Sequence, residues 1–285
     1  MQIATCYQHA GYWIDPIIRE VAVKPGQYTI TRRELIGMGV ATVGATLLSG
    51  CQVIHPADGP ADMPLISPTL VTRVKPPTLT AGLGTTVPLS SQTQEAFMYV
   101  PTGYKASVAA PFVLMFHAEQ ANALSALNLF QPYADAHGLV LLAVESYYPS
   151  WDVISTGDYG PDVQFTNDAL AAAFNEVNVD PSRVTVEGFS DGASYALAMG
   201  RTNGDLFSKV VSFSASFMPP YTPLGMPKFF MAQGTGDQTF DITESGDLID
   251  SKLVAAGYNV DYVRFDGVHE VPDAIVQQAI AFIVS

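Results

Sequence analysis

The chain has 285 residues, with 13 Lys or Arg against 27 Asp or Glu, so its formal net charge is −14. Because phosphate contacts need clustered Lys and Arg, this balance argues against a nucleic-acid partner. The two cysteines, Cys6 and Cys51, are too few for a disulfide framework or a cysteine-rich zinc site, and a hydrophobic content of 48% argues against disorder.

Residues 1–50 have the features of an export signal. Arg32 and Arg33 stand directly before an uncharged apolar run, 35–48. This run is shorter than the ~20 residues that span a bilayer, so a signal peptide fits better than a membrane-spanning helix. The arginine pair resembles a twin-arginine export signal; the alternative is a chance pair before an ordinary buried helix. Residues 1–30 exceed what such a signal needs, and either a natural extension or a misassigned start explains them.

The apolar run ends in a motif that resembles a bacterial lipobox, Leu-Ser-Gly-Cys at 48–51. In such a motif the thiol of the cysteine forms a thioether with lipid, and the cysteine becomes the first mature residue. We therefore expect Cys51 to be lipidated and the protein to be an exported lipoprotein of the cell envelope. The alternative is a stretch of small residues with an unmodified cysteine.

Residues 51–78 are predicted to form a Pro-rich tether. They contain six prolines and little hydrophobic periodicity, a composition typical of extended linkers. The alternative is a structured arm that packs on the following domain.

A single α/β domain is predicted over 79–285. Two ranges, 79–83 and 95–100, are expected to form a first antiparallel pair of strands. Further strands are expected at 111–116, 139–144, 184–187, 209–214, 228–232 and 261–265. Helices are expected at 121–137, 162–178, 190–202, 244–256 and 271–284, with Pro132 breaking or kinking the first of them. This alternation predicts a mostly parallel central sheet with helices on both faces.

The strand at 184–187 runs into Gly-Phe-Ser-Asp-Gly at 188–192 and then into a helix. Strand, tight turn and helix are the context in which a Gly-x-Ser-x-Gly motif presents a nucleophilic serine. Glycines at both ends leave room for a turn that a Cβ would obstruct. The motif therefore predicts Ser190 as a nucleophile, with the backbone N–H of Asp191 as one donor to an oxyanion.

A serine nucleophile needs a base and a residue that orients the base, in the chain order Ser, Asp or Glu, His for this kind of sheet. His269 is the only histidine after Ser190, and it follows the strand that ends at 265. Asp237 follows the strand at 228–232 and is our first candidate for the orienting acid. Asp241 is its competitor.

The range 112–282 resembles the phospholipase/carboxylesterase group of α/β-hydrolases and the related polyhydroxybutyrate depolymerase-like esterases. The residues that carry the resemblance are Phe-His at 116–117, Gly-Phe-Ser-Asp-Gly at 188–192, Gly-Thr-Gly-Asp at 234–237 and Val-His-Glu-Val-Pro at 268–272. The resemblance implies an α/β-hydrolase fold and hydrolysis of carboxylic esters through an acyl-enzyme, without a cofactor. An ester, small or polymeric, is the expected substrate.

The turn after the strand at 111–116 is expected to supply the second oxyanion donor. The N–H of Glu119 is the first candidate and that of Gln120 the second. The family usually has His-Gly where this chain has His117 and Ala118, so the loop differs in shape, and we expect the Glu119 side chain to point outward.

Gln120, Trp151 and Phe217 are candidates to line a substrate pocket, because they follow strands at the edge that should hold Ser190. For the aromatic residues, packing in the core is the alternative. No His, Asp and Glu pattern has the spacing of a metal site, so no metal is expected. Ester hydrolysis is the first functional hypothesis. The others are a polyester depolymerase or a serine peptidase on the same fold, and a surface binding protein without activity.

Overall fold

The computed structural model describes residues 8–9, 12–13, 67–84, 86–89 and 94–285. Two compact units divide the chain, Met1–Ala61 and Asp62–Ser285. In the first unit the short strands β1 (Gln8–His9) and β2 (Tyr12–Trp13) pair antiparallel. The arginine pair, Cys51 and residues 51–66 of the predicted tether lie outside the described residues. Within the described part of the chain, no helix is both long enough and apolar enough to cross a bilayer.

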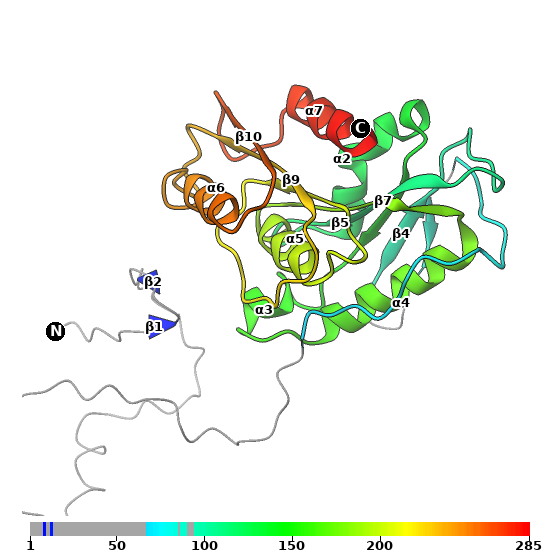
Figure 1. Ribbon diagram of the computed structural model, residues 1–285, viewed down its shortest axis with the longest axis horizontal. Coiled ribbons are helices and arrows are strands. Elements are labelled where there is room, and N and C mark those ends of the chain that lie inside the picture. The colour runs from blue at the N-terminus through cyan, green and yellow to red at the C-terminus, as the bar shows by residue number, and fades with distance from the viewer. Residues whose placement is uncertain (1–7, 10–11, 14–66, 85, 90–93) are drawn as a thin grey trace, which may run out of the picture. The chain divides into compact units, whose positions relative to one another are not determined.

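The second unit is built on one eight-stranded sheet, in the order β10-β9-β8-β7-β5-β6-β4-β3 (Figure 1). The strands are β3 (Thr86–Pro88), β4 (Ala96–Tyr99), β5 (Ala110–Phe116), β6 (Val140–Val144), β7 (Val179–Phe189), β8 (Lys209–Phe213), β9 (Lys228–Gly234) and β10 (Val260–Phe265). β4 pairs antiparallel with β3 and β6, and every other neighbouring pair is parallel. The prediction of a mostly parallel sheet is confirmed.

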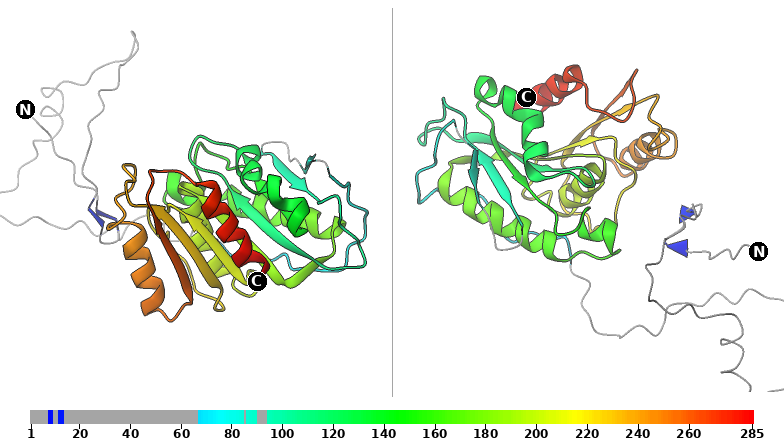
Figure 2. Two further views of the ribbon diagram at one scale, coloured as in Figure 1. Left: turned by 90° about the horizontal axis from the view of Figure 1, so that it is seen from above. Right: turned by 180° about the vertical axis from the view of Figure 1, so that it is seen from behind.

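Helices cover both faces of the sheet. They are α2 (Ala123–His137), α3 (Asp152–Ser155), α4 (Pro161–Glu176), α5 (Asp191–Thr202), α6 (Gly246–Ala255) and α7 (Asp273–Val284). The buried residues of α2 and α7 pack in one hydrophobic cluster, and those of α4, α5 and α6 pack in another on the opposite face. Figures 1 and 2 show α2 and α7 on one side of the sheet and α4 and α5 on the other.

The central strands are buried because both of their faces are covered. Every residue of β5 and β6 is buried, which agrees with their continuous apolar sequences. The strand order reverses around β5, since the chain passes from β5 to β6 on one side and then returns to β7 on the other. In sheets of this kind, ligands bind beyond the carboxyl ends of the strands at such a reversal.

Two local predictions differ from the structure. The first antiparallel strand is β3 (Thr86–Pro88), so the prediction of a strand at 79–83 is wrong. Helix α2 continues through Pro132 to its left-handed cap at Gly138, where φ is 64°. Pro132 has no N–H to donate to the carbonyl of Asn128, one turn earlier in the helix. Both residues lie on the exposed side of α2, where water can solvate that carbonyl.

The described part of the Pro-rich segment, 67–78, packs on the domain as the structured-arm alternative expects. Leu70 is fully buried, and its N–H donates to Oδ1 of Asn203 over 2.7 Å. Asn203 Nδ2 in turn donates to the carbonyl of Pro68 over 2.9 Å. The N–H groups of Val71 and Thr72 both donate to Oδ1 of Asn167. Two buried or half-buried asparagines therefore hold this arm in place.

Candidate active site

Ser190 lies in a strained turn between β7 and α5. Its φ is 58° and its ψ is −120°, a conformation that residues with a Cβ rarely adopt. The N–H of Ser190 donates to the carbonyl of Phe213 at the end of β8 over 2.9 Å, which helps to hold this conformation. The turn places Ser190 at the carboxyl end of β7, beside the reversal in strand order.

The two glycines of the motif are required by close contacts. A Cβ on Gly188 would lie 2.2 Å from the carbonyl oxygen of Gly192, and a Cβ on Gly192 would lie 2.3 Å from the carbonyl oxygen of Phe116. The turn therefore closes tightly on itself and packs directly against the end of β5. These contacts agree with the sequence prediction that a Cβ at either glycine would obstruct the turn.

The structure brings Ser190, His269 and Asp237 together from three separate segments. Nε2 of His269 lies 3.0 Å from Oγ of Ser190, and Nδ1 of His269 lies 2.8 Å from Oδ2 of Asp237. These distances allow Nδ1–H to donate to the carboxylate while Nε2 accepts from the hydroxyl. The three residues thus form one continuous chain of hydrogen bonds.

Asp237 is held as an anion by its surroundings. Burial opposes its ionisation, but hydrogen bonds from His269 and from the N–H groups of Phe240 and Thr239 lower the pKa of its carboxyl below the ordinary value. Asp241 instead accepts from Thr243 in an exposed turn and does not contact His269. Of the two candidates, only Asp237 reaches the imidazole.

The loop that carries His269 packs closely against Gly234, a contact that the sequence did not predict. A Cβ on Gly234 would lie 2.4 Å from the carbonyl oxygen of Val268, so the loops bearing Asp237 and His269 can approach each other only with glycine there. The His269 ring is packed between Phe189 and Phe240, with centroid distances of 4.9 and 5.1 Å. The position of Gly234 at the start of Gly-Thr-Gly-Asp, where β9 ends, was the available signal.

Two backbone N–H groups are free to receive a ligand beside Ser190. In the described part of the chain, the N–H groups of Glu119 and Asp191 donate to no other protein group. The N–H of Gln120 donates to the carbonyl of Pro149 over 2.7 Å, and φ of Gln120 is 57°. The second candidate donor is therefore engaged in holding the loop. The Glu119 side chain is exposed, as the expectation that it points outward requires.

His117 braces this loop. Its Nδ1–H donates to the carbonyl of Ala118 over 2.7 Å, and its Nε2 accepts the N–H of Ser146 over 3.0 Å. The second contact requires an unprotonated Nε2, and burial lowers the pKa of the ring. His117 is therefore a neutral structural residue.

Trp151 belongs to the core. It is fully buried, it stacks on Tyr195 with a centroid distance of 4.6 Å, and its Nε1–H donates to the carbonyl of His117 over 3.0 Å. The pocket interpretation is therefore corrected in favour of the packing alternative, since no face of the indole is left for a substrate. Phe217 is half-buried in the loop after β8 and does not line the cavity that borders His269. Gln120 is exposed at the edge of a different, acidic depression.

A pair of buried carboxyls, Asp152 and Asp162, organises the segment beside the site. Oδ2 of Asp162 accepts the N–H of Asp152 over 2.7 Å, and Oδ2 of Asp152 accepts the N–H of Asp162 over 3.1 Å. Burial and then the neighbouring charge of Asp152 raise the pKa of Asp162 to about 7. The hydroxyl of Ser150 donates over 2.6 Å to the carboxyl of Asp191. Burial raises the pKa of this carboxyl as well. The sequence analysis missed these roles.

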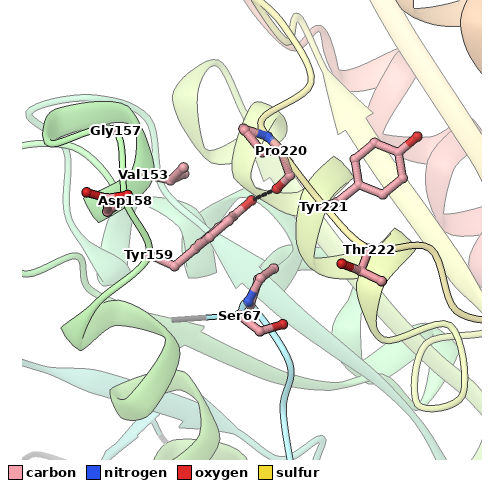
Figure 3. A pocket seen from close by; sticks show the side chains of 9 residues that line it. Ser67, Val153, Gly157, Asp158, Tyr159, Pro220, Tyr221 and Thr222 are labelled. Carbon is pink, nitrogen blue, oxygen red and sulfur yellow. Dashed lines mark hydrogen bonds between the residues drawn. The ribbon is translucent and has the colours of Figure 1, made fainter. Parts of the chain in front are cut away.

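Two cavities matter for ligand binding. One of about 410 Å³ borders His269 and the loop at 117–118. Another of about 350 Å³ lies between the arm at 67–68 and the segment 220–222, where the hydroxyl of Tyr159 donates to the carbonyl of Pro220 (Figure 3). Only the first contains a member of the hydrogen-bonded chain. Among the residues that the structure describes, no group of His, Cys, Asp and Glu is arranged to hold a metal ion.

Comparisons with known proteins identify the fold. No protein-family model matches the sequence, and no curated protein matches it. Similar solved structures include an S-formylglutathione hydrolase from Staphylococcus aureus, with 14% identity, a TM-score of 0.57 and coverage of 70% of this chain and 98% of that one. A Bacillus cereus carboxylesterase has 17% identity, a TM-score of 0.51 and coverage of 67% and 94%. A butyrate-bound Thermogutta terrifontis esterase has 15% identity, a TM-score of 0.53 and coverage of 67% and 88%. The chain has the α/β-hydrolase fold.

Proposed function

We propose that the protein is a serine hydrolase that cleaves carboxylic esters with small or short-to-medium acyl groups. The observation that carries the proposal is the continuous chain of hydrogen bonds from Ser190 through His269 to Asp237, at a strained turn with two free N–H groups beside it. A nucleophile, a base, an orienting acid and two free N–H groups are the set of groups that acyl transfer uses, which supports the proposal.

In this mechanism the hydroxyl oxygen of Ser190 attacks the ester carbonyl carbon while Nε2 of His269 takes the hydroxyl proton. His269 then gives that proton to the departing alcohol oxygen, and an acyl group remains on Ser190. Water attacks the acyl-enzyme by the same steps in reverse and releases the acid. Asp237 holds the imidazole in the tautomer with its proton on Nδ1 and stabilises the imidazolium.

The negative charge of the tetrahedral intermediate needs donors that are in place beforehand. The N–H groups of Glu119 and Asp191 would supply them, and Asp191 also stands at the positive end of α5. Because Ala118 stands where the family that the chain resembles usually has glycine, its Cβ adds bulk to a loop that lines the cavity beside His269. This favours compact esters.

A comparison of substrate classes tests the proposal against its alternatives. We expect p-nitrophenyl acetate and butyrate to be hydrolysed faster than an aminoacyl p-nitroanilide, because an amide carbonyl is less electrophilic than an ester carbonyl. We also expect them to be hydrolysed faster than an insoluble polyester, because a polymer chain must reach a cavity of only about 410 Å³. A faster rate on the anilide would indicate a peptidase, and a faster rate on the polymer a depolymerase. Labelling of the protein by a fluorophosphonate checks for an activated serine independently of the substrate.

We also propose that the mature protein is a lipoprotein of the cell envelope, held at a membrane through Cys51. The sequence features at 31–51 support this. Replacement of Cys51 with serine is expected to move the protein from the membrane fraction to the soluble fraction, because the thioether to lipid cannot form. Cys6→Ser is the matched control and should leave fractionation unchanged. Membrane association of Cys51→Ser equal to that of the wild type would contradict lipidation.

A further inference from the structure

Glu187, three residues before Ser190, has a buried carboxyl group without a partner. Its side chain is 1% exposed, and neither of its carboxyl oxygens has a hydrogen-bond partner among the described residues. In the sheet it lies in register with Met115 of β5 and Val211 of β8, on the face that α2 and α7 cover with apolar side chains. A buried polar group without a partner is costly, so a functional explanation is needed.

Glu187 lines the cavity of about 410 Å³ that borders His269. Apart from the exposed Glu270, the other polar side chains in the cavity wall already have partners. His117 is bonded to Ala118 and Ser146, His269 to Asp237 and Ser190, and the hydroxyl of Ser125 donates to the carbonyl of Asn122. Among the residues that line this cavity, Glu187 is thus the buried one whose polar group has no partner.

The electrostatics of the cavity favour a positive ligand. Its wall includes a second carboxylate, the exposed Glu270, and the aromatic rings of Phe116 and Phe189. None of the described residues that line the cavity is Lys or Arg. Carboxylates together with aromatic rings attract cations, and the chain as a whole carries a net charge of −14.

The position of the cavity indicates which part of an ester would enter it. In the proposed reaction, on which this inference rests, His269 must reach the alcohol oxygen to protonate it, so the alcohol portion lies beside His269. The cavity wall includes His269 itself and the next two residues, Glu270 and Val271. The alcohol portion is therefore placed at the mouth of this cavity.

We propose that the cavity binds the alcohol portion of an ester whose alcohol carries a protonated amine, with Glu187 as the anionic partner of the ammonium group. Without a ligand, burial raises the pKa of the Glu187 carboxyl well above its ordinary value, which favours the protonated form. Binding of the cation ionises Glu187, whose proton passes to the solvent, and the ammonium N–H then donates to the carboxylate.

Two acetate esters of nearly equal shape test the proposal. In 2-(dimethylamino)ethyl acetate the alcohol carries a protonated nitrogen, and in 3-methylbutyl acetate a CH group replaces that nitrogen. We expect kcat/KM at pH 7 to favour the amine ester by about tenfold in the wild type. In Glu187→Gln and in Glu187→Met this ratio should fall to about one. The ratio compares two substrates on one preparation, so it does not depend on how much of a variant is folded.

Glu270→Gln is the matched control, because it removes the exposed carboxylate of the same cavity. If Glu187 is the partner, the ratio of kcat/KM for the two esters should fall by less than about threefold in this variant. A loss as large as that of Glu187→Gln would show a general effect of negative charge and overturn the assignment. A wild-type ratio of one or below would overturn the proposal while leaving ester hydrolysis intact.

A binding experiment separates this inference from the proposed function. We expect protonated 2-(dimethylamino)ethanol to bind the full-length protein more tightly than 3-methylbutanol, with release of up to one proton. That release is measured by calorimetry as a dependence of the binding enthalpy on the ionisation enthalpy of the buffer. Glu187→Gln should abolish it. If 3-methylbutanol binds as well as the amino alcohol, or no proton is released, the inference is wrong even for a protein that hydrolyses neither ester.

Discussion

Replacement of Ser190 with alanine is expected to lower kcat/KM for p-nitrophenyl butyrate by about 10⁴-fold or more, because the acyl-enzyme cannot form. The backbone at this position has to be strained, but alanine has the same Cβ as serine, so the turn should be retained. The free N–H groups of Glu119 and Asp191 also remain, and they account for a small residual rate. The measurement is steady-state hydrolysis together with fluorophosphonate labelling, and labelling should be lost.

Ser194→Ala is the matched control for this variant. Ser194 lies one turn further along α5, is fully buried, and bonds through its hydroxyl to Ser216. Its replacement removes a hydroxyl of the same kind without touching His269, so labelling should persist. Equal turnover by Ser190→Ala and the wild type would refute the nucleophile. A wild-type protein that neither reacts with the probe nor hydrolyses esters would favour the binding-protein alternative.

Replacement of Asp237 with asparagine is expected to lower kcat by about 10²- to 10⁴-fold with little change in KM. Oδ1 of Asp237 accepts two backbone N–H groups, from Thr239 and Phe240, and an asparagine oxygen can keep both bonds. The amide nitrogen then faces Nδ1 of His269 and donates to it. This fixes the proton of the imidazole on Nε2, where it can no longer accept the proton of Ser190.

Asp241→Asn is the control for this second prediction. Asp241 is four residues away in an exposed turn, and its hydrogen bonds go to Thr243. The same change of charge there should leave kcat within about twofold. If the two variants had equal activity, Asp237 would not be the residue that orients His269.

The sequence correctly predicted Ser190 and His269 as neighbours because local rules determine their positions. A glycine-flanked serine between a buried strand and a helix can be read from a few adjacent residues, and His269 was the only histidine left after it. Asp237 was chosen over Asp241 by its distance from a strand end, and the structure places it against His269 at 2.8 Å. Parallel strands bring these segments to one edge of the sheet.

Features that depend on long-range packing were not predictable in the same way. The sequence placed Trp151 after a strand, but only the stacked ring of Tyr195 shows that the indole is in the core. Asp152 and Asp162 look like ordinary residues at helix starts until their mutual hydrogen bonds are seen. Glu187 lies in a predicted strand, and the sequence does not indicate whether its carboxyl has a hydrogen-bond partner. In each case the deciding contact is with a residue on another element.

The docked arm at 67–78 has a consequence for the order in which the chain folds. Leu70 bonds to Asn203, 133 positions later, and Val71 bonds to Asn167, 96 positions later. The arm is synthesised before either partner exists, and the bond of Leu70 cannot form until the chain has been made past α5. Closing loops of this length is also entropically slow compared with forming a helix. The first part of the domain to be made is therefore among the last to be fixed, after the helix that begins next to Ser190 is in place.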